Sequence, residues 1–200
     1  MLVYFDTEFE GLYKDAKLIS IGLVAEDNRE LYCELAGIDI TKQDKWIVDN
    51  VLANTALYSN QVCDYKSIAD FVNTKCSFVE DITDPSNYFC GYKHEVADKI
   101  KKWLSVYDEV QLVSDVGHYD MVQFIDLFEE AFKLPHNICA YCHDINQDIA
   151  SYLNISDKQA FDYSREQILF DNGIDISGKK HNSLYDAKVI QSIYKIVHKK

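Results

Sequence analysis

The sequence predicts an α/β protein built on a mixed β-sheet that is flanked by α-helices. The 200 residues are 48% apolar and include 14 Tyr and 10 Phe, which is enough to bury a core in one domain spanning 1–200. Strand patterns gather near the N-terminus, and helical patterns then alternate with a further strand. Strands followed by alternating helices and a strand are typical of a layered α/β sheet of mixed direction.

The strands are expected where apolar runs are short. Leu2 to Phe5 is a continuous apolar run, which is typical of a central strand covered on both faces. The second and third strands are separated by the turn-prone pair Asp27 and Asn28, which predicts an antiparallel meander. The expected strands are 2–9, 17–26, 29–36 and 109–116.

The helices are expected where apolar residues recur with helical spacing. In the last helix, Ala187, Ile190, Ile193, Tyr194 and Val197 fall on one side. We found no internal repeat or linker that would divide the chain. The expected helices are 46–53, 67–76, 95–106, 120–132, 145–153, 164–170 and 183–198, and the clearest loop is 80–88.

The net charge of −13 is unfavourable for a protein that binds a long nucleic acid through its surface, because such binding normally uses basic residues and counterion release. An enzyme that contacts a few phosphates through bound cations can still be acidic overall, because the metal reverses the local charge. The charge therefore disfavours an extended binding surface and leaves a metal-assisted site open.

Cysteine use and hydropathy predict a cytoplasmic protein. We recognise no segment of signal-peptide type and no run of membrane-spanning length. The six cysteines are too sparse for a small secreted scaffold, so we expect most to be reduced. The letters Cys139-Ala-Tyr-Cys142-His143 match a c-type haem attachment site, but without an export signal we expect a chance match in a loop.

The end of the first strand carries two carboxylates, Asp6 and Glu8, two positions apart. Strand side chains alternate between faces, so these two acids point the same way and Thr7 points the other way. In a chain with 33 acidic residues, such a pair also fits a half-exposed strand end. The buried character of the strand favours a site in which bound cations offset the charge.

Two later segments also carry acids and histidine where a strand or helix begins or ends. The first is 114–124, with Asp120 directly after Tyr119, and the second is 179–189, with His181 and Asp186. A purely structural role is the alternative for both acids. Asp120 would be a carboxylate near a helix N-terminus, and Asp186 would belong to a capping box that begins at Ser183.

In their order these motifs resemble the DEDDh group of 3′-to-5′ exonucleases in the RNase H-like superfamily, which includes ribonuclease T and oligoribonuclease. In that group Asp-x-Glu lies on the first strand, a Phe/Tyr-Asp pair follows a later strand, and His-x4-Asp precedes the last helix. The resemblance spans nearly the whole chain by motif order and implies the ribonuclease H-like fold. The matching residues are Asp6, Glu8, Asp120, His181 and Asp186.

The resemblance implies hydrolysis of phosphodiester bonds with two divalent ions, Mg²⁺ or Mn²⁺. Asp6 would bridge both ions, Glu8 and Asp186 would complete one site, and Asp120 would serve the other directly or through water. Such a pair of ions activates water, neutralises the phosphate and stabilises the leaving oxygen, and oxygen ligands favour these metals over zinc. His181, with an unperturbed pKa of about 6.5, is suited to accept the proton of the attacking water.

Two of these assignments have competitors in the sequence. Asp115 closes the strand before Asp120 and is also a candidate for the site. Relatives often have Asn four residues before the Asp of the second motif, where this chain has Val116. His143 and Asp148 repeat the His-x4-Asp spacing. We favour His181 because the helix of the last motif follows it, and we expect it on a mobile loop before that helix.

The implied activity is that of a 3′-to-5′ exoribonuclease that acts on single-stranded or short RNA. Relatives are often homodimers, which makes a homodimer the expectation for this chain. Phe9 corresponds to an apolar residue near the terminal base in relatives, and Lys180 could attract a phosphate; a core Phe and a solvated loop fit the same letters. Three other functions stay open: a catalytically silent nucleic-acid-binding module, a 3′-to-5′ DNA exonuclease, and another metal-dependent phosphohydrolase. The complete residue set, with its histidine, argues against the silent module.

Overall fold

The computed structural model describes residues 1–59 and 87–199 and places a six-stranded sheet at its centre. The strand order is β4-β3-β2-β1-β5-β6, so β1 lies inside the sheet between β2 and β5. β1, β2 and β3 form an antiparallel meander, whereas β4, β5 and β6 pair in parallel with their neighbours. The strands are β1 (Leu2–Phe9), β2 (Leu18–Ala25), β3 (Glu30–Leu35), β4 (Tyr88–Gly91), β5 (Val110–Ser114) and β6 (Ile138–Asp144).

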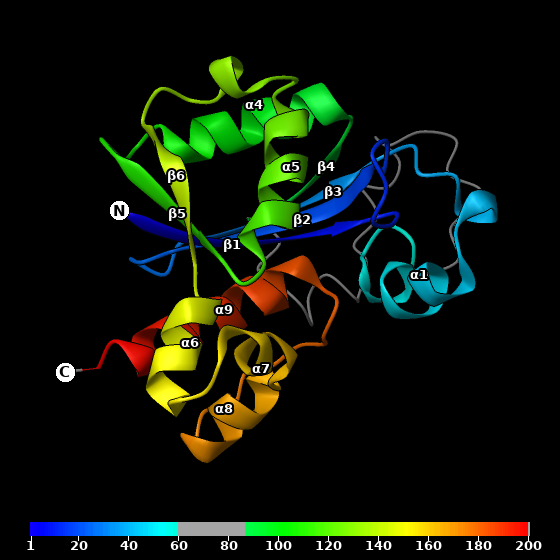
Figure 1. Ribbon diagram of the computed structural model, residues 1–200. Coiled ribbons are helices and arrows are strands. Elements are labelled where there is room, and N and C mark those ends of the chain that lie inside the picture. The colour runs from blue at the N-terminus through cyan, green and yellow to red at the C-terminus, as the bar shows by residue number, and fades with distance from the viewer. Residues whose placement is uncertain (60–86, 200) are drawn as a thin grey trace.

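Helices cover both faces of this sheet (Figure 1). α4 and α5 lie on one face, α6 to α9 lie on the other, and α1 lies beside the end of β1 (Figure 1). The α-helices are α1 (Lys45–Asn50), α4 (Lys93–Leu104), α5 (Gly117–Leu127), α6 (Asn146–Leu153), α7 (Asp157–Asp162), α8 (Arg165–Asp171) and α9 (Ser183–Val197). Short 3₁₀ turns are η1 (Ile40–Lys42), η2 (Leu52–Asn54) and η4 (Ala131–Lys133).

The alternation of β1 divides the core into two clusters. Val3 and Phe5 are buried with side chains of α4 and α5, whereas Tyr4 is buried with side chains of α6, α8 and α9. Asp6 and Glu8 continue the Tyr4 face, because residues two apart on a strand share a face. The sheet therefore directs both carboxylates toward the layer that contains α9.

The expected fold class is confirmed, with corrections at the edges of the sheet. The expectation of a loop for the Cys139–His143 segment is wrong, because these residues belong to β6. The sequence also did not predict β4. Both are edge strands with several half-exposed side chains, so neither has the continuous apolar run or strict alternation that identifies a strand. The two cysteines of this segment, Cys139 and Cys142, are free thiols.

The helices also depart from expectation at several ends. α5 begins at Gly117 and ends at Leu127, where the sequence predicts 120–132, and the short helix α7 was missed. The helix expected over 67–76 and most of the loop expected over 80–88 fall outside the described residues, and Tyr88 already begins β4. Within the described ranges, no helix has the length and apolar character needed to cross a bilayer.

Candidate active site

The N-terminus of α9 and the end of β1 meet at one point of the sheet. Glu8 lies opposite Ser20 in the β1–β2 ladder, and the hydroxyl of Ser20 lies 2.9 Å from that of Ser183 at the start of α9. Gly22, opposite Asp6, has no side chain between the sheet and the backbone of Ser183 and Leu184. The bare glycine thus lets α9 approach the two β1 carboxylates.

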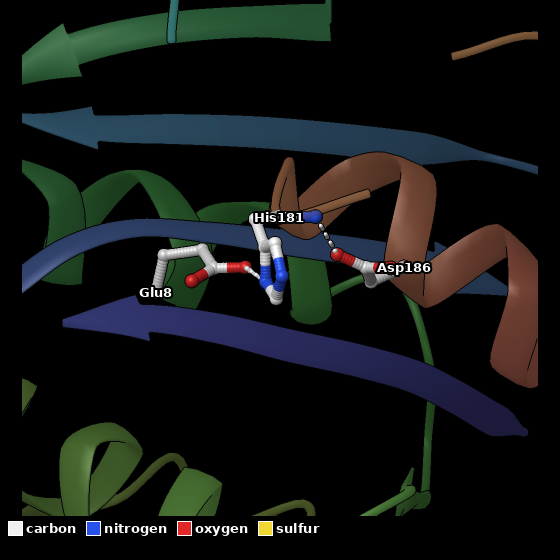
Figure 2. A group of neighbouring side chains, drawn as sticks. All are labelled: Glu8, His181 and Asp186. Carbon is white, nitrogen blue, oxygen red and sulfur yellow. Dashed lines mark hydrogen bonds and ion pairs between the residues drawn. The ribbon is translucent and has the colours of Figure 1, made fainter. Parts of the chain in front are cut away.

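Glu8, His181 and Asp186 form a cluster at this junction. One ligand atom from each lies within 4.8 Å of the other two. His181 Nδ1 lies 3.7 Å from Glu8 Oε1, and the backbone N–H of His181 donates to Asp186 Oδ2 at 2.8 Å. Figure 2 shows the imidazole beside the Glu8 carboxylate and Asp186 reaching back from α9. As expected, His181 precedes the helix instead of lying on it.

Asp6 and Asp120 line the same cleft, which has a volume of about 350 Å³ and also contains Glu8 and His181. Asp6 Oδ2 is buried and has no hydrogen-bond partner among the described residues. Burial and the negative charges of Asp120, Asp186 and Glu8 raise the pKa of Asp6 well above its usual value. A buried carboxylate oxygen without a donor is costly unless it is protonated or meets a cation.

Asp120, on α5, is held in place by hydrogen bonds from two neighbouring strands, β1 and β5. Thr7 donates to Asp120 Oδ1 from its backbone N–H at 3.1 Å and from its hydroxyl at 2.6 Å, and the Ser114 hydroxyl donates to Asp120 Oδ2. Burial raises the pKa of Asp120 to about 6, against the opposing effect of these hydrogen bonds. Thr7 therefore fixes Asp120 to β1. The side chain of Thr7 points to the opposite face of the strand from Asp6 and Glu8.

These residues fit a divalent cation by their chemistry. Burial also raises the pKa of Asp186, with a contribution from the charge of Glu8. Carboxylates crowded in one cleft repel one another, and a bound cation reverses that effect. Their oxygen atoms are the ligands that Mg²⁺ and Mn²⁺ prefer. Asp6 and Asp120 lie outside the three-residue group whose ligand atoms approach within 4.8 Å, but they line the same cleft as Glu8 and His181.

No family model matches the chain. A curated 3′-5′ exoribonuclease of Mycobacterium tuberculosis is 23% identical over 149 residues, which is 74% of this chain and 73% of the relative, and the same match recurs in a second strain.

Solved structures resemble the chain over nearly its whole length. A 3′-exonuclease solved in a study of 3′-end specific recognition of histone mRNA stem-loop has a TM-score of 0.62 at 13% identity over 98% of this chain, but the match covers only 63% of that longer chain. The nuclease domain of 3′hExo, a DEDDh family member bound to rAMP, has a TM-score of 0.58 at 16% identity and is covered to 88%, with 96% of this chain. S. pombe Pop2p in its Mg²⁺ and Mn²⁺ bound form has a TM-score of 0.50 at 15% identity, covering 98% of this chain and 82% of that one.

The chain has the fold of the DEDDh 3′-to-5′ exonucleases. The resemblance found in the motif order is thereby confirmed at the level of the fold. In this DEDDh fold, the end of β1, the start of α5 and the turn before α9 bring Asp6, Glu8, Asp120 and His181 to one cleft, and Asp186 lies beside Glu8 and His181. Their individual roles remain predictions.

The competitors of the second and third motifs occupy different places in the DEDDh fold. Asp115 lines the cleft, but its carboxylate accepts two hydrogen bonds from the Arg165 guanidinium, at 2.6 and 2.8 Å. His143 pairs with Asp148 at 2.5 Å, and neither residue is among those that line the cleft. The His-x4-Asp spacing is therefore repeated at a hydrogen-bonded His–Asp pair away from the cluster at β1.

The two residues predicted to bind substrate have different surroundings. Phe9 lines the cleft. The Lys180 ammonium lies 3.6 Å from Glu166 Oε1, so this carboxylate partly neutralises its charge. The role of Lys180 in substrate binding stays a prediction. Sequence analysis gave no role to Trp46, which is 51% exposed, lines the cleft and has its ring 5.0 Å from the His181 imidazole. Nothing in the sequence around Trp46 indicates that its side chain lines the cleft.

Proposed function

We propose that this protein is a metal-dependent 3′-to-5′ exoribonuclease that acts on the 3′ end of single-stranded or short RNA. The observation that carries the proposal is the cleft at the end of β1, where Asp6, Glu8 and Asp120 face His181. The exoribonuclease name of the M. tuberculosis relative supports RNA as the substrate. The rAMP bound to 3′hExo, whose fold this chain shares, is consistent with a nucleotide in the corresponding cleft.

The carboxylates would hold two divalent ions, Mg²⁺ or Mn²⁺. Asp6 is the residue suited to bridge them, because its Oδ2 is buried without a partner among the described residues. Glu8 and Asp186 would complete one site, and Asp120 would serve the other directly or through water. When bound, such ions neutralise the scissile phosphate and lower the pKa of a water molecule. The Mg²⁺ and Mn²⁺ bound form of Pop2p supports divalent ions in this fold.

His181 would act as the general base. Its ring is partly exposed and lies beside Glu8 at the mouth of the cleft. The attacking water would lose a proton to the imidazole as its oxygen forms a bond to phosphorus. The bond from phosphorus to the 3′ oxygen of the preceding nucleotide would then break, and that oxygen would take a proton from solvent water, leaving a nucleoside 5′-monophosphate and an RNA with a new 3′ hydroxyl.

The walls of the cleft are suited to hold an unpaired terminal base. Phe9, Trp46 and Tyr119 all line it, and stacking on an aromatic ring contributes about 1 to 3 kcal/mol per base without sequence preference. These aromatic side chains, next to Asp6, Glu8 and Asp120, would accommodate one terminal nucleotide with its phosphate toward the bound cations. This arrangement supports cleavage from a free end of a single strand.

The test is digestion of a 5′-labelled single-stranded RNA and a matched DNA in Mg²⁺, Mn²⁺ or EDTA. We expect a ladder that shortens from the 3′ end of the RNA with either metal and disappears in EDTA. His181→Ala and Asp120→Ala proteins should lose the ladder, whereas His143→Ala should keep it, because His143 has the same local spacing and lies away from the cleft.

The other outcomes identify other functions. Failure of the folded wild-type protein to cleave either polymer with metal would overturn the exonuclease proposal and favour a binding module. Cleavage of free nucleotides alone would favour a phosphohydrolase, and preference for DNA would favour a DNA exonuclease. We also propose one domain over 1–200, a cytoplasmic location and a homodimer; light scattering of the eluted protein measures the last.

A further inference from the structure

The backbone at His181 is held in an unfavourable conformation. His181 lies in a turn of residues 179–182, in which the N–H of Asn182 donates to the carbonyl of Lys179 at 3.2 Å. Its φ is +63°, in the left-handed region that residues with a side chain seldom adopt. Such a conformation persists only where the surroundings fix it, so the contacts of this turn determine where the imidazole points.

Asn54, at the end of η2, bonds to the turn on both sides of His181. Its side-chain Nδ2 donates to the carbonyl of Lys180 at 2.9 Å, and its own carbonyl accepts from Asn182 Nδ2 at 2.9 Å. The second hydrogen of the same amide goes to the carbonyl of Asn50 at 2.6 Å. The side chain of Asn54 thus ties α1 to the turn before α9, and the two hydrogen bonds to the turn are reciprocal.

The partners of Asn54 are themselves fixed. Asn182 is 1% exposed, and its Oδ1 accepts from the N–H of Tyr185, which caps α9. On the other side, the fully buried Glu34 accepts from the N–H groups of Ala56 and Leu57 at 2.6 and 2.7 Å. Asn54 therefore joins two anchored segments, and its amide can transmit the position of one to the other.

We propose that Asn54 is a positioning residue for His181, an inference that rests on the proposed function. By holding Lys180 and Asn182, it keeps the His181 N–H on Asp186 and the imidazole beside Glu8. Asn54 acts through the turn and contacts none of the reacting groups. None of the motifs contains it, and its effect is to keep the general base oriented.

The experiment compares Asn54→Ala and Asn54→Asp with Asn137→Ala. Asn137 is a matched control, because its half-buried amide also donates to two main-chain carbonyls, those of Leu104 and Tyr107, away from the cleft. Asn54→Asp keeps the shape of the side chain and removes both donors, so it reports on the hydrogen bonds if the alanine protein does not fold. The measurements are kcat and KM on a short RNA, Mn²⁺ affinity by calorimetry, and hydrogen exchange of residues 179–182.

We expect the Asn54 variants to lose roughly 10-fold to 100-fold in kcat, as small misplacements of a catalytic group do, with KM unchanged and Mn²⁺ affinity lowered by much less, because only the N–H donor to Asp186 shifts and the carboxylates remain. Exchange in 179–182 should accelerate in these variants and stay at the wild-type rate in Asn137→Ala. Wild-type kcat with faster exchange would overturn the positioning role, and unchanged exchange would overturn the hydrogen-bonded clamp. If the wild-type protein cleaves no RNA, the proposed function fails, and the exchange comparison still decides whether Asn54 holds the turn.

Discussion

At the scale of single residues, the candidate site depends on side chains that surround the five motif residues. Asp120 is oriented by Thr7 and Ser114, and Asp115 is occupied by Arg165. Partners that orient a catalytic or metal-binding group commonly matter almost as much as the group itself. Thr7 is the clearest case, because it lies between Asp6 and Glu8 in the sequence and points to the opposite face.

Thr7→Val tests this support for Asp120. The valine keeps the shape and the backbone N–H but removes the hydroxyl that donates to Asp120 at 2.6 Å in a buried site. A hydrogen bond to a charged group contributes about 1.5 to 3 kcal/mol, and we expect a loss of this size in the free energy of unfolding. Urea denaturation in EDTA measures it. Thr41→Val is the matched control, because Thr41 donates to Asp39 at the same 2.6 Å on the exposed surface; an equal loss in both proteins would contradict the prediction.

At the scale of secondary-structure elements, the position of α9 on β2 decides whether the site assembles. Gly22 is the contact point, and a Cβ there would lie 2.3 Å from the Ser183 carbonyl and 2.4 Å from the Leu184 Cα. Both are backbone atoms, which cannot rotate away. Any side chain at residue 22 must therefore displace the N-terminus of α9, and with it the His181 turn.

Gly22→Ala should lower the free energy of unfolding by about 1 to 3 kcal/mol, as overpacking of a core does, and should also reduce nuclease activity per folded molecule. Gly173→Ala is the comparison, because Gly173 has a φ of +66° but open space around it. That variant should lose stability through backbone strain alone and keep its activity. Full activity of folded Gly22→Ala would show that α9 does not need this close approach.

Glu34 links β3 to the segment after η2 and should give that link a pH dependence. Burial raises the pKa of Glu34 in the folded protein, against the effect of hydrogen bonds from Ala56, Leu57 and the Tyr88 hydroxyl. The folded state then holds the proton more tightly than the unfolded state, whose pKa is about 4.3. Stability from this group is present below the unfolded pKa and is lost as the pH rises through the folded pKa.

The advantage of wild type over Glu34→Gln in the free energy of unfolding should therefore shrink as the pH rises from 4 toward neutrality. The variant lacks this titration, so the difference between the two proteins isolates it. Urea denaturation at a series of pH values measures the difference. An advantage that grows with pH would mean that the hydrogen bonds outweigh burial and that the pKa of Glu34 is lowered.

At the scale of the whole molecule, the chain is acidic, and several of its carboxylates gather where the proposed function needs cations. The net charge is −13, and burial, with a contribution from the mutual repulsion of these carboxylates, raises the pKa of Asp6, Asp120 and Asp186. Any cation that binds between these carboxylates in the folded state reduces their repulsion. Metal binding should thus be visible as stability as well as activity.

Addition of Mg²⁺ or Mn²⁺ to the metal-free protein should raise its melting temperature, by an amount equivalent to about 2.7 kcal/mol when the free metal is at 100 times its Kd. Asp6→Asn should be more stable than wild type without metal, because one repelling charge is gone, and should gain much less from the metal. Scanning calorimetry with NaCl at equal ionic strength separates binding from screening. An equal gain from NaCl, or an unchanged gain in the variant, would argue against a metal site at Asp6.

The sequence by itself determined the central strands β1, β2, β3 and β5 and the order of the acidic motifs. Short continuous apolar runs and fixed motif spacing are local properties, and local patterns suffice to recognise them. The tertiary structure alone decided the edge strands β4 and β6, whose pairing comes from neighbours and not from their own composition. It also decided the hydrogen bonds from Thr7 to Asp120 and from Asn54 to the His181 turn. These contacts join residues more than 100 positions apart, and the packing of α9 and the η2 segment against the sheet, rather than any local pattern, brings them together.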